Sequence, residues 1–424
     1  MKKLKVILIG AGNRGSLYTG LMNNYPDKFE VVAVAEPIES RRISKQKAHN
    51  IPDELCFTDY NDLLNLGKIA DIAVIATMDR LHLDPAIKAI KLKYDLLLEK
   101  PIATTPEECM EIAKCAKENN VKVIVCTVLR YTDIFKTVKQ TIDSGKLGEI
   151  VSINHEECVG NVHQSHSFVR GNWGNIERSS FMLLQKSCHD LDLLQWLIGK
   201  KCKKVQSFGS LTYFTRKNAP KGSPEYCIEG CPAGDTCPYN SVNLYLKSDS
   251  AWFRTTSTKM VKPTDADVEK AIRETQYGKC VYKCDNDVVD HQTVNMLFED
   301  DITVTFSMNA FNRGGRFMHI FGTKGELHVG LGKEDPYIKL YDFETKETSD
   351  IKIGGGADGI EGGHGGGDDG IIVDLYDYVC DAYSGKSVPN IAESCYNHML
   401  VFASEKARNE GTIVDIEDYI NSFN

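Results

Sequence analysis

Three glycines near the start of the chain have the spacing of a phosphate-binding turn. They lie in residues 10–15 (GAGNRG), directly after the apolar run 5–9 and before a segment of helical period. In G-x-G-x-x-G, the first glycine permits a tight turn, the second lets a pyrophosphate approach the backbone, and the third lets helix and strand pack closely. The helix N-terminus would face the phosphates. The predicted dinucleotide-binding residues here are Gly10, Gly12, Asn13, Arg14 and Gly15.

An acidic residue lies about where the ribose of such a dinucleotide would bind. Glu36 directly follows the second apolar run, 31–35. A carboxylate about twenty residues beyond the glycines can accept hydrogen bonds from the ribose hydroxyls, which favours NAD. Arg41 and Arg42 follow and could bind a 2′-phosphate, so NADP stays open. The alternative is a structural glycine turn with a solvated Glu36.

Two further segments carry side chains that could transfer a proton. The tripeptide EKP, with Lys100 at its centre, follows the apolar run 95–98, where parallel sheets bind ligands. Pro101 stiffens the turn and would fix the direction of Lys100. His189 lies in residues 185–192 (QKSCHDLD) before an apolar helix face, and histidine transfers protons near neutral pH. Taken alone, a solvated lysine and a structural histidine are the ordinary interpretations.

The periodicity of the chain predicts two α/β domains that would position these side chains. Apolar runs that alternate with helical segments indicate a parallel sheet covered on both faces, so residues 1–128 are predicted as a doubly wound Rossmann domain. From residue 129, longer runs alternate with period two, which favours an open, mainly antiparallel sheet. We therefore expect residues 129–424 to form a substrate and oligomerisation domain.

The composition is that of an ordinary globular protein. The 424 residues are 42% hydrophobic and 26% charged, and 50 basic against 59 acidic residues give a net charge of −9. Such a chain is a poor candidate for nucleic-acid binding. No apolar run approaches the roughly 20 residues of a membrane span. The apolar start runs straight into the glycine turn without a cleavage site, so we expect a cytoplasmic protein.

Taken together, the motifs resemble the Gfo/Idh/MocA family of NAD(P)-dependent sugar and cyclitol dehydrogenases, which includes glucose–fructose oxidoreductase and myo-inositol dehydrogenase. The resemblance covers nearly the whole chain, and its most specific parts are the EKP and histidine motifs. The segments that carry it are GAGNRG at 10–15, ATMDRLH at 76–82, EKPIATT at 99–105, LRYTDIFK at 129–136, GKLGEI at 145–150 and CHDLDLLQWL at 188–197.

The resemblance implies hydride transfer between NAD(P) and a sugar, sugar-derivative or cyclitol hydroxyl, with Lys100 and His189 as catalytic residues. A histidine base would take the hydroxyl proton, and the ammonium would stabilise alkoxide character. The family often has an acid four residues before the histidine, whereas this chain has Gln185, which cannot carry a proton. Further cofactor contacts are expected at Thr77, His82, Glu99 and Lys100. Substrate contacts are expected at Gln185, Lys186, Asp192 and His364.

Two other functions stay open at this point. His364 lies in the glycine-rich segment 354–370, which is either a solvated loop or a lid over the substrate. NAD-dependent redox glycosidases related to the family carry a similar H-G-G segment. A dinucleotide-binding sensor or regulator is the alternative of another class. We expect a small-molecule carbohydrate or cyclitol substrate and a homo-oligomer, dimer or tetramer.

Five of the fourteen cysteines are clustered in a predicted insertion at about 215–289. They read C-x3-C-x5-C and, forty-two residues later, C-x3-C. Four thiolates could bind a structural zinc ion tetrahedrally, although reduced structural thiols and an iron–sulfur cluster stay open. The candidate ligands are Cys227, Cys231, Cys237, Cys280 and Cys284.

Overall fold

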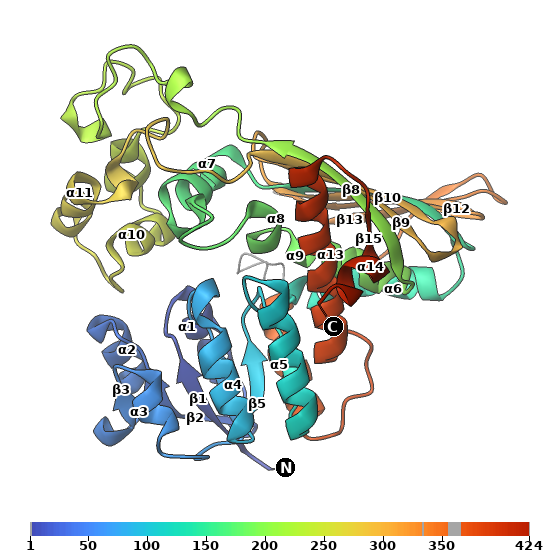
Figure 1. Ribbon diagram of the computed structural model, residues 1–424, viewed down its shortest axis with the longest axis horizontal. Coiled ribbons are helices and arrows are strands. Elements are labelled where there is room, and N and C mark those ends of the chain that lie inside the picture. Colours follow the sequence, from blue (N-terminus) through green and yellow to red (C-terminus); the bar gives the residue numbers. More distant parts are fainter. Residues whose placement is uncertain (1, 333–334, 355–365, 424) are drawn as a thin grey trace.

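The computed structural model describes residues 2–332, 335–354 and 366–423, which form two sheets with their helices (Figure 1). The first sheet has six parallel strands in the order β3-β2-β1-β4-β5-β6. The predicted doubly wound sheet is confirmed. Its strands are β1 (Leu4–Ile9), β2 (Phe29–Ala35), β3 (Cys56–Phe57), β4 (Ile72–Ile75), β5 (Asp95–Leu98) and β6 (Val123–Val125).

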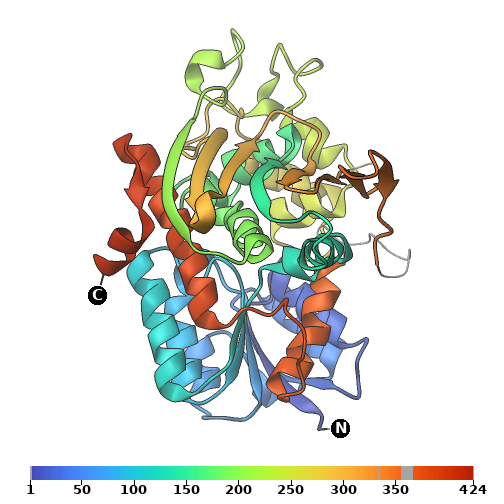
Figure 2. The ribbon, with the colours of Figure 1, turned by 90° about the vertical axis from the view of Figure 1, so that its right-hand side faces the viewer.

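Helices cover both faces of this sheet (Figure 2). Five of them come from the same part of the chain: α1 (Asn13–Met22), α2 (Glu39–His49), α3 (Tyr60–Leu64), α4 (Leu83–Lys91) and α5 (Pro106–Asn119). A sixth, α12 (Gly367–Val379), returns from the far end of the chain and packs Ile371 and Leu375 against Leu8 of the sheet. The boundary at residues 128 and 129 stays a prediction, and the packing of α12 means that the Rossmann core also uses a later segment.

The second sheet has nine strands in the order β14-β13-β12-β11-β7-β10-β9-β8-β15. Neighbouring strands in its described part run antiparallel except β7 and β10, which confirms the expectation of a mainly antiparallel sheet. The strands are β7 (Ile150–Cys158), β8 (Cys202–Ser210), β9 (His291–Phe298), β10 (Thr303–Asn309), β11 (Gly315–Gly322), β12 (Gly325–Leu331), β13 (Tyr337–Asp342), β14 (Thr348–Asp350) and β15 (Val414–Asp415).

Helices cover one face of the second sheet. They are α6 (Asp133–Asp143), α8 (Met182–Gln185), α9 (Cys188–Ile198), α13 (Ile391–Glu410) and α14 (Ile416–Asn421). On β7, Ile153 and His155 are buried on the helix side, whereas Asn154 and Glu156 are exposed on the other. Helix α13 contacts α9 and β8 as well as α5 of the first domain, so it joins the two halves of the molecule (Figure 1).

The predicted insertion extends away from the second sheet beside α7 (Asn161–Ser165) (Figure 1). It contains the helices α10 (Ala251–Thr258) and α11 (Asp265–Glu274) and has a small core of its own around Tyr245, Val268 and Ile272. This lobe therefore carries its own apolar packing.

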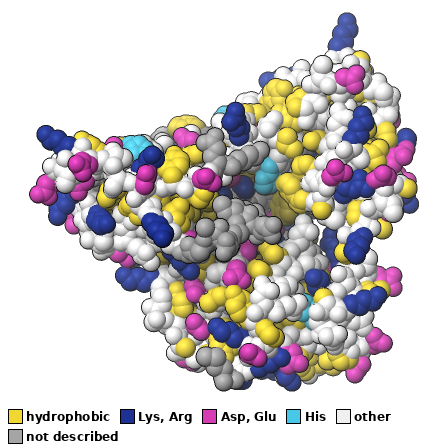
Figure 3. Space-filling view, turned by 180° about the vertical axis from the view of Figure 1, so that it is seen from behind, with side chains coloured by type: hydrophobic (Ala, Val, Ile, Leu, Met, Phe, Trp, Pro, Cys, Tyr) yellow, Lys and Arg dark blue, Asp and Glu magenta, His cyan; other side chains and the backbone are white. Residues whose placement is uncertain are grey.

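Surface charge is mixed on the face seen in Figure 3, where acidic and basic side chains are interspersed. The described residues on this face form no extended basic patch of the kind that binds a phosphate backbone. Among the described helices, none has the length and apolar character that crossing a lipid bilayer requires.

Candidate active site

The glycine turn after β1 has the shape that the motif predicts. A Cβ on Gly10, whose φ is +90°, would lie 2.6 Å from the Ala76 carbonyl oxygen, and one on Gly15 would lie 2.1 Å from the Gly10 oxygen. On Gly12, by contrast, a Cβ would meet only Arg41 Nη1, at 4.0 Å. The first and third glycines thus allow close packing, while the second leaves open the side from which a pyrophosphate would approach α1.

Glu36 lies against this turn. Its side chain is buried, and its carboxylate accepts hydrogen bonds from the backbone N–H of Ala11 at 2.7 Å and of Ile38 at 2.9 Å. Arg42 Nη1 donates a hydrogen bond to the backbone carbonyl oxygen of Glu36 at 2.7 Å. The structure therefore brings the predicted ribose ligand to the glycine turn, and its contact with a ribose stays a prediction.

Arg14 and Glu99 are engaged with each other. Glu99 Oε1 accepts hydrogen bonds from Arg14 Nε at 2.8 Å and from the Tyr18 hydroxyl at 2.6 Å, and Oε2 accepts from the Lys100 N–H at 2.8 Å. Burial opposes ionisation of Glu99, but Arg14, Lys100 and the Tyr18 hydroxyl together outweigh it and lower the pKa of the carboxyl. Arg14 also pairs with Asp368 of α12 at 2.5 Å. These contacts hold the EKP turn against α1. Direct binding of the cofactor by Arg14 or Glu99 stays a prediction.

Thr77 and His82 link the loop after β4 to the EKP turn. His82 is buried, with Nδ1 2.7 Å from the Pro101 carbonyl oxygen and Nε2 3.2 Å from that of Thr77. The Thr77 hydroxyl donates to the Leu81 carbonyl at 3.1 Å. Both residues thus position the edge where a nicotinamide would bind, and their contact with a cofactor stays a prediction.

Lys100 reaches from the first domain to the segment that carries His189. Its Nζ donates to the carbonyl oxygen of Gln185 at 2.5 Å, and His189 is buried in the first turn of α9 four residues later. The Gln185 side-chain amide is turned away from Lys100 and donates to the carbonyl of Ser180. The two predicted catalytic residues therefore lie on segments in direct contact, at the carboxyl end of β5.

A histidine that sequence reasoning missed supports the EKP loop from α13. His398 is fully buried; its Nε2 accepts a hydrogen bond from the Ile102 N–H at 3.1 Å, and its Nδ1 lies 2.8 Å from the Ser394 carbonyl oxygen. Burial lowers the pKa of His398 to about 4, so the imidazole is neutral near pH 7. The local sequence gave no signal, because the contact joins residues almost 300 positions apart.

A cluster of buried charges lies directly behind His189. Arg316 of β11 pairs with Asp190 at 2.8 Å and with Glu157 of β7 at 2.6 Å. His155 Nε2 also lies 2.8 Å from Asp190, and Lys186 Nζ pairs with Glu157 at 3.1 Å. Burial lowers the pKa of the Lys186 ammonium, while the Arg316 guanidinium beside Asp190 holds the pKa of that carboxyl well below its ordinary range.

The alternating pattern of β7 carries a sequence signal for this cluster. On β7 the inward-facing positions of the alternating pattern include His155 and Glu157, which are charged or polar where apolar residues are the rule. The side chains of Lys186 and Arg316 keep 17% and 10% of their surface exposed, although both cations pair with carboxylates. The expectation that Lys186 contacts substrate stays a prediction.

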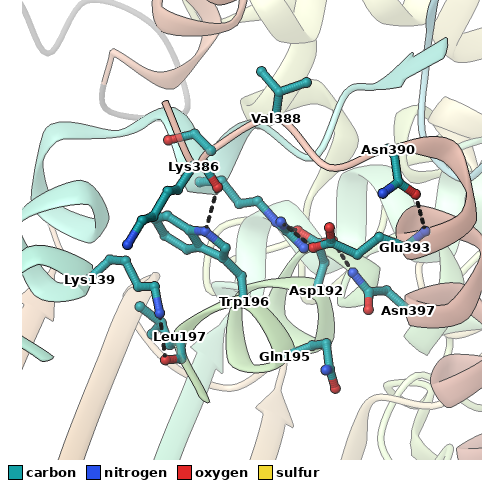
Figure 4. A network of polar contacts seen from close by, with 12 residues as sticks. Lys139, Asp192, Gln195, Trp196, Leu197, Lys386, Val388, Asn390, Glu393 and Asn397 are labelled. Atoms are coloured by element: carbon teal, nitrogen blue, oxygen red, sulfur yellow. Dashed lines mark hydrogen bonds and ion pairs between the residues drawn. The ribbon is translucent and has the colours of Figure 1, made fainter. Parts of the chain in front are cut away.

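Asp192 is held in a buried network away from solvent (Figure 4). Arg130 binds it bidentately, at 2.7 and 2.8 Å, and Asn397 of α13 donates to it at 2.6 Å. Glu393 binds the other side of the Arg130 guanidinium at 2.7 Å. These contacts indicate that Asp192 joins three elements, and the expected contact with substrate stays a prediction. His364, the remaining expected substrate ligand, lies outside the described residues.

The expected zinc site on the insertion is not supported. Cys227 Sγ lies 3.8 Å from the buried Arg170 guanidinium, and Cys284 Sγ donates to the Cys280 carbonyl at 3.5 Å. Within the described ranges, the one group of three or more metal-binding side chains close enough to share an ion contains no cysteine. Cys227 and Cys284 thus contact protein groups, and among the described residues no three of the cysteine sulfurs lie close enough together to share one ion.

Comparison with known protein families identifies the class of protein to which the chain belongs. Residues 4–127 match an oxidoreductase family domain described as an NAD-binding Rossmann fold, and residues 139–354 match the C-terminal α/β domain of the same family. The protein is thus of the NAD-binding oxidoreductase class. More narrowly, the chain belongs to the Gfo/Idh/MocA family, which confirms the resemblance drawn from its motifs.

Similar proteins agree with this assignment. The putative oxidoreductase YteT of Bacillus subtilis is 25% identical over 84% of this chain and 81% of its own length. Inositol 2-dehydrogenase of Salmonella typhimurium is 24% identical over 51% of this chain and 59% of its own length. In fold, the chain resembles a levoglucosan dehydrogenase solved with NADH and L-sorbose, with a TM-score of 0.72, 16% identity, and coverage of 98% of this chain and 99% of that one.

Proposed function

We propose that this oxidoreductase transfers a hydride between NAD and a hydroxyl-bearing carbon of a sugar, sugar derivative or cyclitol. The observation that carries the proposal is the 2.5 Å hydrogen bond from Lys100 Nζ to the Gln185 carbonyl, which brings the EKP turn against the segment of His189. The names of the similar inositol 2-dehydrogenase and levoglucosan dehydrogenase support a polyhydroxylated substrate.

In this proposal His189 takes the proton of the reacting hydroxyl, and the Lys100 ammonium holds the oxygen and stabilises its developing negative charge. Bound NAD would supply the hydride acceptor at its nicotinamide. Lys186 and Arg316 would bind further oxygen atoms of the substrate, because both are cationic side chains that keep part of their surface exposed. Gln185, in the position where the family often has an acid, can offer hydrogen bonds but no proton.

We further propose a preference for NAD over NADP. The buried Glu36 carboxylate at the glycine turn supports this, because a 2′-phosphate would lie beside a negative charge. A cytoplasmic location and a homo-oligomer are parts of the same proposal. The uncovered face of the second sheet carries Phe208 and Tyr337 with 57% and 39% of their surface exposed, and such faces are commonly covered by another copy.

The test is a panel assay with the purified full chain and NAD. Free sugars, cyclitols and aryl glycosides are each followed by absorbance at 340 nm and by release of the aglycone. Steady accumulation of NADH with a sugar or cyclitol is the expected result. Aglycone release without net NADH would instead establish a redox glycosidase. Binding of NAD with neither reaction across the panel would favour the sensor or regulator.

A further inference from the structure

Three metal-binding side chains meet on the uncovered face of the second sheet, far from the glycine turn in the chain. His319 lies on β11, and Glu326 and His328 lie on β12. The antiparallel register pairs His319 directly with His328. Glu326 is two residues from His328, so both side chains leave β12 on the same face. Strand pairing alone therefore brings the three groups together.

The separations of their ligand atoms match those around a small metal ion. His319 Nε2 lies 3.2 Å from one Glu326 oxygen, and His328 Nε2 lies 3.5 Å from the other. One ligand atom from each of the three residues lies within 4.8 Å of the others. Tetrahedral zinc binds histidine nitrogen and carboxylate oxygen at roughly 2.0–2.2 Å, which places neighbouring ligands about 3.3–3.6 Å apart.

The charges also favour a shared cation over two protonated histidines. The rings of His319 and His328 lie 3.7 Å apart between centroids, so two imidazolium ions would repel each other. The neutral imidazole is the form that binds metals. The carboxylate of Glu326 then supplies the negative charge that a divalent cation requires.

There is room for a further ligand beside the group. A cavity of about 460 Å³ is lined by Glu326 and His328 together with Tyr337, Lys339 and Tyr341 of β13. The His328 side chain keeps 47% of its surface exposed, so an ion could enter from solvent. Lys339 is the one cationic residue named in the lining of this cavity, and its Nζ pairs with Asp350 at 3.5 Å.

We propose that His319, Glu326 and His328 form a binding site for one divalent transition-metal ion of the zinc class. Two imidazoles and one carboxylate are ligands that such ions accept. The site is separate from the proposed active site and does not depend on the proposed function.

Cobalt(II) is a suitable probe, because thiolate ligands give it intense charge-transfer absorption that nitrogen and oxygen ligands lack. The metal-free full chain is titrated with Co²⁺ at pH 7.5, and the ion bound per chain is measured by equilibrium dialysis. We expect one ion per chain without thiolate bands. Removing a single metal ligand should weaken binding by more than the 10–100-fold typical of removing an outer-shell partner.

The variants are His328→Ala and Glu326→Gln, with His291→Ala on β9 as the matched control, because it removes a half-exposed histidine of the same sheet outside the group. Circular dichroism establishes that each variant is folded. Loss of cobalt binding in the two site variants, with retention in the control, supports the site. Absence of binding in the wild type, equal binding in all proteins, or thiolate bands that persist in His328→Ala would overturn it.

Discussion

His398 Nε2 accepts a hydrogen bond from the backbone N–H of Ile102 at 3.1 Å, and this contact ties helix α13 to the loop that carries Lys100. A protonated imidazole could not accept this bond. Burial lowers the pKa of His398 from 6.5 to about 4 in the folded protein. The folded chain therefore binds fewer protons than the unfolded chain between these two values.

The first prediction is a loss of stability in mild acid. The pKa of His398 is lower in the folded chain than in the unfolded chain, so neutral His398 stabilises the fold fully above about pH 6.5. As the pH falls toward 4, this stabilisation is lost, which lowers the free energy of unfolding by about 3 kcal/mol. Urea denaturation at pH 7.5 and at pH 5 measures it. His398→Gln can keep both hydrogen bonds without titrating, so its stability should fall less between the two pH values. The same pH dependence in both proteins would contradict the prediction.

The second prediction concerns His189. Replacing it by alanine should lower kcat by about 10²–10⁴-fold, because the reacting hydroxyl loses its base, while the affinity for NAD stays close to that of the wild type. Steady-state kinetics with the substrate identified in the panel and a fluorescence titration with NADH give the two values. His291→Ala is the control for loss of a histidine elsewhere. A wild-type kcat in His189→Ala would remove this residue from the mechanism.

The third prediction concerns Glu36 and the choice of cofactor. Glu36→Gln removes the negative charge but keeps an oxygen for the Ala11 N–H, which the carboxylate now binds at 2.7 Å. The KM for NAD should rise and the KM for NADP should fall, because the 2′-phosphate no longer meets a carboxylate. Kinetics with each cofactor at saturating substrate measure the ratio. If both KM values rise by the same factor, Glu36 only supports the turn.

The sequence predicted the Rossmann half well, because its strands are buried on both faces and its glycines stand directly after β1. The two-residue strand β3 (Cys56–Phe57) was missed, since it is too short to show a period. In the second half, alternation predicted the strands β7 to β11. Neither β12 to β15 nor the pairing of the strands was predicted. Register sets His319 opposite His328, and the spacing of nine residues along the chain does not reveal it.

The ion pairs that support the site could not be predicted, because they join residues far apart in the sequence. The sequence placed Lys100 and His189 on segments that prove to be in contact, because each follows a recognisable motif. It could not show that Arg130 lies against Asp192, or Arg316 against Asp190, since 62 and 126 residues separate the partners. The family resemblance implies that Asp192 contacts substrate, and this stays a prediction; in the structure its carboxylate binds Arg130 and Asn397.

The last prediction tests whether Asp192 stabilises the fold through its ion pair with Arg130 or binds substrate. Breaking a buried ion pair by neutralising one partner commonly costs about 3–5 kcal/mol, because the other charge is left uncompensated. Asp192→Asn should therefore lower the free energy of unfolding by no more than about that amount, because Glu393 still pairs with Arg130 at 2.7 Å, while the KM for substrate in the folded enzyme stays near the wild-type value. Urea denaturation and steady-state kinetics at a temperature where the variant is folded measure both.

The double variant Arg130→Met/Asp192→Leu is the matched control, because it removes both charges and keeps apolar volume at a site where both side chains are 1–2% exposed. Its stability should exceed that of Asp192→Asn, since no uncompensated charge is buried. If Asp192→Asn instead leaves stability unchanged and raises the KM, the carboxylate serves the substrate, and the contact with Arg130 contributes little to holding α9 against α13.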